Sequence, residues 1–302
     1  MQAISTTFMQ HIAANGLSYG TIEEYNFRLD LFKSVDAEIN AHNQSNSTYT
    51  LGHNFLSTMT QGEKKKLTGY KAVGATTETK IYTPSNADTV NWVTNGGVTP
   101  VKNQASCGSC WAFSSTGGME GAHFVASGKL LSFSEQQLVS CSKLNHACNG
   151  GSMALAFRFY KSHAAVLEAD YPYTSGAGKT AACDASKPAT SVKATGYAMV
   201  TPNDSAQLKA ALDKGPVSVA IEADKIAFQA YQSGVLTGSA CGTQLDHGVL
   251  AVGYGTENGT PYYLVKNSWG ATWGAAGYIK IGIESGAGVC GIQEQPVQPT
   301  SN

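Results

Sequence analysis

Seven cysteines constrain this chain more than any other feature of its sequence. They lie at positions 107, 110, 141, 148, 183, 241 and 290 of 302 residues. An odd number of widely spaced cysteines predicts three disulfides and one free thiol, a pattern typical of proteins that fold in an oxidising compartment. Four Asn-x-Ser/Thr triplets are compatible with glycosylation on the secretory pathway; they begin at Asn43, Asn46, Asn203 and Asn258.

The first residues do not carry the signal sequence that such a compartment requires. Residues 1–8 lack a basic stretch and an apolar core, so we expect a signal sequence to have preceded Met1 and to have been removed. No run of 18 apolar residues occurs, which argues against a membrane span. The formal net charge of −1 argues against a basic surface for nucleic acid. We therefore expect a globular protein with neither nucleic acid nor membrane as a partner. We also expect it to be a monomer.

Residues 1–45 are predicted to be helical. Six positions within them are spaced by three or four residues and share one helix face: Glu24, Arg28, Phe32, Val35, Ile39 and Asn43. Periodicity alone indicates no more than an amphipathic helix. Residues 44–90 are rich in Ser, Thr, Asn and Gly and predict a loosely structured connector, in which Lys64-Lys65-Lys66 forms a solvated patch.

A compact domain is expected from Asn91 onward. Helices are predicted first, over 110–127, 134–141, 153–162 and 204–214. Strands are predicted at 217–221, 248–253, 262–266 and 278–283. A helical half followed by a β-rich half predicts two subdomains that face each other across a cleft. Gly117-Gly118 inside the first helix costs about 1 kcal/mol per residue relative to Ala, so we expect another backbone to pack closely there.

The segment Gln104-Ala-Ser-Cys107-Gly-Ser-Cys110-Trp111 places a cysteine at the first turn of a predicted helix. Unpaired N–H groups and the helix dipole favour a negative charge at that position. A thiol with the ordinary pKa of about 8.5 is thiolate in only about one molecule in three thousand at pH 5. A nucleophilic Cys110 therefore needs a cationic partner as well as the dipole. His247, at the start of a predicted strand, and Asn267, in Lys-Asn-Ser-Trp-Gly, are the candidates that follow it.

Other interpretations of these residues stay open on the sequence alone. Cys107-x-x-Cys110 has the spacing of a zinc or redox pair, but zinc needs two more ligands and a thioredoxin-like motif needs a βαβ unit that we do not find. His247 or Asn267, taken singly, is most simply a structural residue. Their joint occurrence in this order favours a catalytic set, for which we expect no metal and no cofactor.

The string Cys-Gly-Ser-Cys-Trp at 107–111 resembles the nucleophile segment of the papain-like cysteine proteases. The resemblance extends from about Phe8 to about Val297. It implies an α+β, papain-like two-subdomain fold, with a helical left subdomain, a β-barrel-like right subdomain and an N-terminal, mostly helical inhibitory prodomain. The implied domains are a propeptide over 1–85 and a peptidase domain over 86–302.

The resemblance also implies the role of each catalytic residue. Cys110 is the nucleophile, and His247 is its base and later its general acid. Asn267 holds the imidazole ring, and Trp269 shields that contact from water. The side chain of Gln104 and the backbone N–H of Cys110 bind the oxyanion.

Disulfides and a substrate cleft are implied in the same way. The implied pairs are Cys107–Cys148, Cys141–Cys183 and Cys241–Cys290, which leave Cys110 free. The residues implied to contact substrate are Gly150, Gly151, Ser152, Met153, Ala220, Leu245, Asp246, Trp269 and Gln295. Met153, Ala220 and Leu245 predict an apolar side chain at the P2 position of the substrate.

The N-terminal helix matches the propeptide helix motif of cathepsin L-like proenzymes at Glu24, Arg28, Phe32, Ile39 and Asn43, with Val35 in place of an expected Asn. In the second propeptide motif, Leu56 stands for an aromatic residue and Thr58 for an acidic one, so the carboxylate of the usual acid trigger is missing there. The resemblance implies that the connector fills the cleft in the direction opposite to a substrate. It also implies autocatalytic removal at acidic pH, with the mature chain starting near Pro84–Asp88.

Together these implications predict a cysteine endopeptidase in zymogen form. We expect protein and peptide substrates, inhibition by its own propeptide and by cystatin-type proteins, and a location in a lysosome, a digestive vacuole or outside the cell. The interval from Cys110 to His247 has no insertion to block the cleft, which favours an endopeptidase over a dipeptidyl exopeptidase. The intact catalytic set argues against a silent binding or storage relative, and the full downstream domain argues against a small inhibitor protein.

Overall fold

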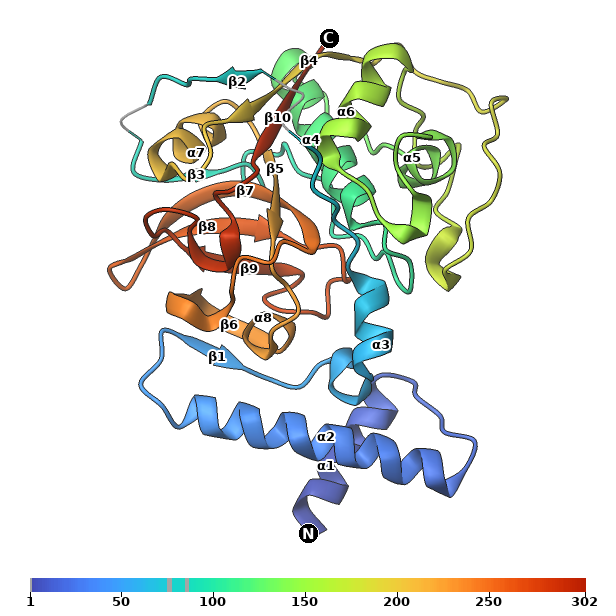
Figure 1. Cartoon of the computed structure of the whole chain (residues 1–302), viewed down its shortest axis with the longest axis vertical. Helices are drawn as coiled ribbons and strands as arrows, with labels where there is room; N and C mark the ends of the chain where they lie inside the picture. Colours follow the sequence, from blue (N-terminus) through green and yellow to red (C-terminus); the bar gives the residue numbers. More distant parts are fainter. Residues whose placement is uncertain (1, 75–77, 85–86) are drawn as a thin grey trace.

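The computed structural model describes residues 2–74, 78–84 and 87–302 (Figure 1). The chain begins with two helices, α1 (Gln2–Ala14) and α2 (Ile22–Asn43), which cross at the N-terminal end of the molecule. The prediction of continuous helix over 1–45 was wrong at the join. Gly16 has a φ of +60° just after α1, and the Thr21 side chain caps α2 by accepting the Glu24 N–H at 3.2 Å.

The segment after α2, expected to be loosely structured, is instead held against the rest of the chain. Strand β1 (Tyr49–Leu51) pairs with β6 (Tyr231–Leu236), β2 (Thr79–Lys80) with β4 (Ala194–Val200), and β3 (Val90–Asn91) with β7 (His247–Glu257). Between β1 and β2 lie η1 (Phe55–Thr58), α3 (Gln61–Lys64) and η2 (Lys65–Leu67). Lys64 is buried, so the lysine run is not a uniformly solvated patch. Pairing with strands that are distant in the sequence orders this segment, although its own residues favour no particular secondary structure.

The helical half contains α4 (Cys110–Ser127), α5 (Glu135–Cys141) and α6 (Met153–Ser162), with the short turns η3 (Ala147–Asn149) and η4 (Ser175–Ala177). These helices confirm the predicted ranges. A Cβ on Gly117 would lie 2.7 Å from Leu250 Cδ2, and one on Gly118 would lie 3.0 Å from Phe157 Cζ. The glycines of α4 therefore make room for side chains of β7 and α6, and not for another backbone as expected.

The other half is built on one sheet with the strand order β1-β6-β9-β8-β7-β5-β10-β4-β2. Strands β5 (Val217–Ile221), β7, β8 (Thr260–Lys266) and β9 (Tyr278–Gly282) lie where strands were predicted, whereas β4, β6 and β10 (Val297–Ser301) were missed. Helix α7 (Ser205–Leu212) lies within its predicted range. The remaining short elements are α8 (Ile226–Gln229), η5 (Gly238–Ala240) and η6 (Val289–Gly291).

Each half has its own buried core, and the connector contributes to both. Trp269, Trp273 and Phe228 belong to the core of the β-rich half, which also takes up Leu67 and Tyr82 of the connector. Tyr70 packs instead with the core of the helical half. Figure 1 shows the chain after α3 running between the two halves. The fold is α+β, with two facing subdomains and a mostly helical N-terminal region.

Two sequence expectations concern absences. Among the described residues, no helix has both the length and the apolar character needed to cross a membrane. Across residues 2–74, 78–84 and 87–302, no group of three His, Cys, Asp or Glu side chains is arranged to hold a metal ion.

Candidate active site

Cys110 is the first residue of α4, and its side chain is fully buried. The backbone N–H of Gly248, the residue after His247, donates to Cys110 Sγ at 3.3 Å, so the thiol faces the start of β7. The other six cysteines form the pairs that the resemblance implied: Cys107–Cys148, Cys141–Cys183 and Cys241–Cys290. Cys110 is free. A zinc or redox pair of Cys107 with Cys110 is thereby ruled out.

His247 is the first residue of β7, and the side-chain amide of Asn267 binds one nitrogen of its ring. Its Nε2 is hydrogen-bonded to Asn267 Oδ1 at 2.8 Å, and the ring packs against Trp269 with centroids 4.8 Å apart. Because an amide oxygen only accepts, Nε2 carries the hydrogen. The other ring nitrogen, Nδ1, has no hydrogen-bond partner among the described residues. His247 therefore has one nitrogen fixed and one available to exchange a proton.

Burial controls the protonation of this pair in the structure as it stands. It raises the pKa of the Cys110 thiol to about 12 and lowers the pKa of His247 to about 4, although the hydrogen bond that His247 donates to Asn267 partly opposes the second shift. Both directions disfavour a charged side chain in a site closed to water. In this covered state burial favours the neutral thiol and the neutral imidazole, the opposite of the ion pair that catalysis by Cys110 requires.

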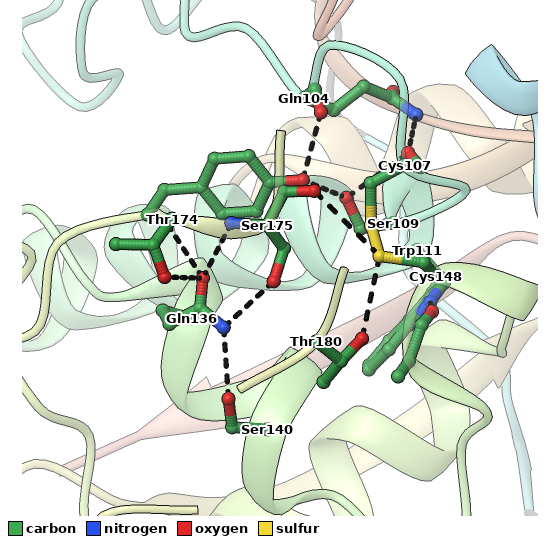
Figure 2. Close-up of a disulfide and its surroundings, with 12 residues drawn as sticks. Gln104, Cys107, Ser109, Trp111, Gln136, Ser140, Cys148, Thr174, Ser175 and Thr180 are labelled. Atoms are coloured by element: carbon green, nitrogen blue, oxygen red, sulfur yellow. Dashed lines mark hydrogen bonds between the residues drawn. A yellow bond between two sulfur atoms is a disulfide. The ribbon is translucent and has the colours of Figure 1, made fainter. Parts of the chain in front are cut away.

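Gln104 is fixed next to the nucleophile by several contacts. Its Nε2 donates to the carbonyl oxygens of Cys107 and Leu67, both at 2.9 Å, and its Oε1 accepts from Ser268 Oγ at 2.7 Å. The Tyr173 hydroxyl donates to the backbone carbonyl oxygen of Gln104 at 2.8 Å. Figure 2 shows Gln104 beside the Cys107–Cys148 disulfide and Ser109. Ser268 and Tyr173 were not predicted; for Ser268, its place beside Asn267 was the available signal.

The connector passes directly over these groups. The carbonyl oxygen of Leu67 accepts from Gln104 Nε2 and also from Trp269 Nε1, at 3.1 Å. The N–H groups of Gly69 and Tyr70 donate to the Asp246 carbonyl at 2.9 and 2.8 Å. Asp246 thus contacts the connector through its backbone, while its carboxylate accepts from the Ala223 N–H.

Gly150 and Gly151 contact the connector on the side opposite Asp246. Gly151 N–H donates to the Gly69 carbonyl, and Lys71 N–H donates to the Gly151 carbonyl, both at 2.8 Å. These bonds make a parallel bridge between Tyr70 and Gly151. A Cβ on Gly150 would lie 2.5 Å from Gly69 O, so the close approach of the two backbones requires glycine there.

The ring of Tyr70 enters the pocket predicted to receive the P2 side chain. It packs in one cluster with Met153, Ala220 and Leu245, and its hydroxyl donates to Gln295 Oε1. Ser152, Met153 and Gln295 also line a cavity of about 170 Å³ next to the ring. The structure therefore brings the predicted substrate-binding residues together around one connector segment.

Comparison with known proteins agrees with this arrangement. Residues 83–300 match the model of the papain family cysteine proteases, and residues 8–63 match that of the cathepsin propeptide inhibitor domain (I29). The chain belongs to the papain family of cysteine proteases. It is a cysteine endopeptidase in zymogen form, as the sequence predicted.

Similar proteins span nearly the whole chain. Germination-specific cysteine protease 1 of Arabidopsis thaliana is 41% identical over 314 residues, which cover 96% of this chain and 81% of that protein. A KDEL-tailed cysteine endopeptidase of the same plant is 44% identical over 278 residues, covering 90% of this chain and 73% of the relative. Digestive procathepsin L2 proteinase from the Tenebrio molitor larval midgut superposes with a TM-score of 0.91 at 34% identity, covering 98% of this protease and 99% of that chain.

The propeptide residues predicted from the sequence fasten helix α2 to the residues that follow it and to the β-rich half. Phe32 is buried and stacks on His53 with centroids 3.9 Å apart, and Ile39 is buried in the core of the β-rich half. Asn43 exchanges two hydrogen bonds with the backbone of Leu51, at 2.8 and 2.9 Å. These contacts fix α2 to the start of the connector.

Arg28 binds two carboxylates and the backbone carbonyl of position 58, where Thr58 stands in place of an acidic residue. Its guanidinium contacts Glu24 at 3.4 Å and Glu63 at 2.6 Å, and it also donates to the Thr58 carbonyl at 2.9 Å. The Arg28 bond holds the pKa of Glu63 at about 2. Glu63 was not identified from the sequence, although Thr60-x-x-Glu63 is a capping box.

Proposed function

We propose that this protease hydrolyses peptide bonds through Cys110 and His247. The observation that carries the proposal is the pairing of His247 Nε2 with Asn267 Oδ1 at 2.8 Å beside a buried, unbonded thiol. Such a pairing leaves Nδ1 to take the thiol proton. Once the connector leaves and water enters, the burial that keeps both groups neutral is relieved, and the helix dipole and the imidazolium together stabilise the thiolate.

The reaction then proceeds in two halves. The Cys110 thiolate adds to the scissile carbonyl carbon, and the resulting oxyanion is bound by Gln104 Nε2 and the Cys110 N–H. His247 gives its proton to the leaving amine as the C–N bond breaks, which leaves a thioester. A water molecule, deprotonated by His247, attacks the thioester, releases the carboxylic acid and restores the thiol.

Residues 1 to about 85 act as the inhibitor in this proposal. The parallel bridge between Tyr70 and Gly151 supports a connector that runs opposite to a substrate and therefore resists cleavage. We place the peptidase domain at 86–302 and the start of the mature chain near Pro84–Asp88; Ser85 and Asn86 lie outside the described residues. Maturation is autocatalytic at acidic pH.

The substrate preference follows from the occupant of the pocket. Tyr70 buries its ring against Met153, Ala220 and Leu245, which supports an apolar or aromatic P2 side chain. Its hydroxyl bond to Gln295 supports tolerance of tyrosine at P2. The mature enzyme acts as a monomer on proteins and is open to cystatin-type inhibitors. Three disulfides support passage through the secretory pathway to a lysosome, a digestive vacuole or the exterior.

An epoxide inhibitor and a P2-varied fluorogenic panel test this function. Acid-treated wild type is expected to bind one equivalent of epoxide at Cys110 and to cleave substrates with P2 Phe, Leu or Tyr fastest. Cys110→Ala is expected to remain full length and inactive at pH 4–5. A Cys110→Ala protein that shortens unaided by roughly 9 kDa, the mass of about 85 residues, or a panel dominated by P2 Asp or Gly, contradicts the proposal.

A further inference from the structure

Beyond the cleft, the connector makes a second set of contacts on strand β4. Thr79 and Lys80 pair in parallel with Met199 and Val200, and the Met199 N–H donates to the Glu78 carbonyl at 3.0 Å. In the sheet, β4 lies between β10 and β2. When the connector departs, no other strand of the described chain covers that side of β4. Departure of the connector exposes the edge of β4. Extended peptides bind such an edge by pairing with it as an additional strand.

Next to this edge, Tyr82 is held by side chain and backbone together. Its N–H donates to Gln207 Oε1 at 2.8 Å, and its carbonyl accepts from Gln207 Nε2 at 3.0 Å. Its ring is 4% exposed, whereas the neighbouring Ile81 is 82% exposed. One amide of α7 thus satisfies both backbone groups of an extended residue, while that residue's aromatic ring enters the core of the β-rich half.

One cavity joins the predicted P2 pocket to strand β4. Its volume is about 170 Å³, and it is lined by Met153 and Gln295 of the pocket as well as by Met199 of β4 and Thr79 of β2. An extended chain in the P2 pocket therefore has an open path to β4. Tyr82 lies twelve residues beyond Tyr70 in the sequence.

We propose that the matured protease uses the β4 edge and the Gln207 pocket as an exosite for protein substrates. The ligand is an extended segment with an aromatic side chain about a dozen residues N-terminal to P2. Because the connector runs opposite to a substrate, substrate residues preceding P2 follow the path of connector residues after Tyr70, now antiparallel to β4. The inference rests on the proposed function for this direction. Contacts so far from the reacting bond are made equally before and during the reaction, so they lower KM and leave kcat unchanged.

Long fluorogenic substrates test the exosite on acid-matured enzyme. They share one cleavage site and carry N-terminal extensions with either Tyr or Ala at graded distances, roughly 8 to 14 residues before P2. We expect KM about tenfold lower for Tyr than for Ala at one spacing, with equal kcat. Gln207→Ala removes both hydrogen bonds that hold the backbone of the segment. The aromatic ring is then no longer positioned at its pocket, so the Tyr and Ala substrates are expected to become equivalent. Gln232→Ala, which removes an exposed amide from β6 on a distant part of the sheet, is expected to keep the difference.

Several results overturn the inference. If Tyr lowers KM relative to Ala at none of the spacings, the aromatic pocket is excluded. If the lower KM for Tyr persists in Gln207→Ala, the effect does not arise at this site. Gln207→Glu, which keeps an acceptor but loses the Nε2 donor, is expected to show an intermediate gain and serves if Gln207→Ala does not fold. Hydrolysis of a short dipeptidyl substrate by the wild type measures the active site without the exosite. If the wild type fails to hydrolyse that substrate, the result contradicts the proposed function and not the exosite.

Discussion

Replacing Gly69 by alanine is expected to loosen the connector directly above the nucleophile. A Cβ at this position would lie 2.2 Å from the carbonyl oxygen of Gly108 and 2.7 Å from its carbon. Both atoms belong to the backbone of the loop that precedes α4, and Gly108 is itself pinned by a 3.0 Å hydrogen bond from its N–H to the Cys148 carbonyl. The loop cannot move aside, so the connector has to lift.

The energy of that displacement can be worked from the contacts it breaks. Inserting a methyl group into a closely packed contact costs about 1–3 kcal/mol. Lifting Gly69 also weakens its hydrogen bonds to Asp246 and Gly151, at 2.9 and 2.8 Å, each of which contributes about 1 kcal/mol. A net loss of about 2–4 kcal/mol raises the population of the open cleft roughly 30-fold to 700-fold.

Alkylation of Cys110 in the full-length zymogen at neutral pH measures this opening. The thiol is fully buried and the other six cysteines are in disulfides, so iodoacetamide reacts only when the connector opens, at a rate proportional to the open population. Gly62→Ala is the matched control, because a Cβ there meets nothing closer than Thr60 Oγ1 at 3.9 Å. Labelling of Gly69→Ala no faster than that of Gly62→Ala would refute the steric reasoning.

Three further predictions concern the acid response and the oxyanion site. His11 is buried, with its Nε2 unpaired in the described chain, and burial followed by the charge of His53 lowers its pKa to about 4. Its neutral form therefore stabilises the closed zymogen fully above the unfolded pKa of 6.5, and this stabilisation is lost as the pH falls toward 4. His11→Phe is accordingly expected to move the midpoint of maturation, followed on gels from pH 4 to 7, to lower pH; an unchanged midpoint contradicts this role. The Arg28–Glu63 pair has the same sign but a lower pH window: it stabilises fully above the carboxyl's unfolded pKa of 4.5 and is lost only as the pH falls through about 2. Glu63→Gln should therefore speed maturation at pH 7, and equal rates would show that the pair contributes nothing. Gln104→Ala is expected to lower kcat of the matured enzyme about 100-fold or more with little change in KM, whereas a pure rise in KM would mean that Gln104 only binds substrate.

The sequence predicted best those elements whose signals are local. Helix α6 was located to the residue because Met153–Ser162 has a regular apolar period, and Cys110 was identified because its motif is contiguous. The two ends of the catalytic set around it, Gln104 and Asn267, are 163 positions apart in the sequence. The set was recoverable only through family resemblance, since no local rule pairs a histidine with an amide twenty residues away.

The elements that the sequence missed depend on distant partners. Strands β4, β6 and β10 contain Gly, Ser, Pro and Gln, which predict strands poorly, and they form because neighbouring strands receive them. The connector was misjudged for the same reason. Lys64 is buried although it stands in a lysine run; its helix α3 lies close to the prodomain helix α2 (Figure 1) and is joined to it by the Arg28–Glu63 ion pair at 2.6 Å.

The sheet order has a consequence for the precursor. In the zymogen both ends of the sheet are strands of the N-terminal segment, β1 at one end and β2 at the other. Removal of residues 1 to about 85, as proposed above, takes away both strands and leaves β6 and β4 as the outermost ones. Bare strand edges are surfaces for pairing between molecules, so the N-terminal segment shields both edges of the sheet in the precursor as well as covering the cleft.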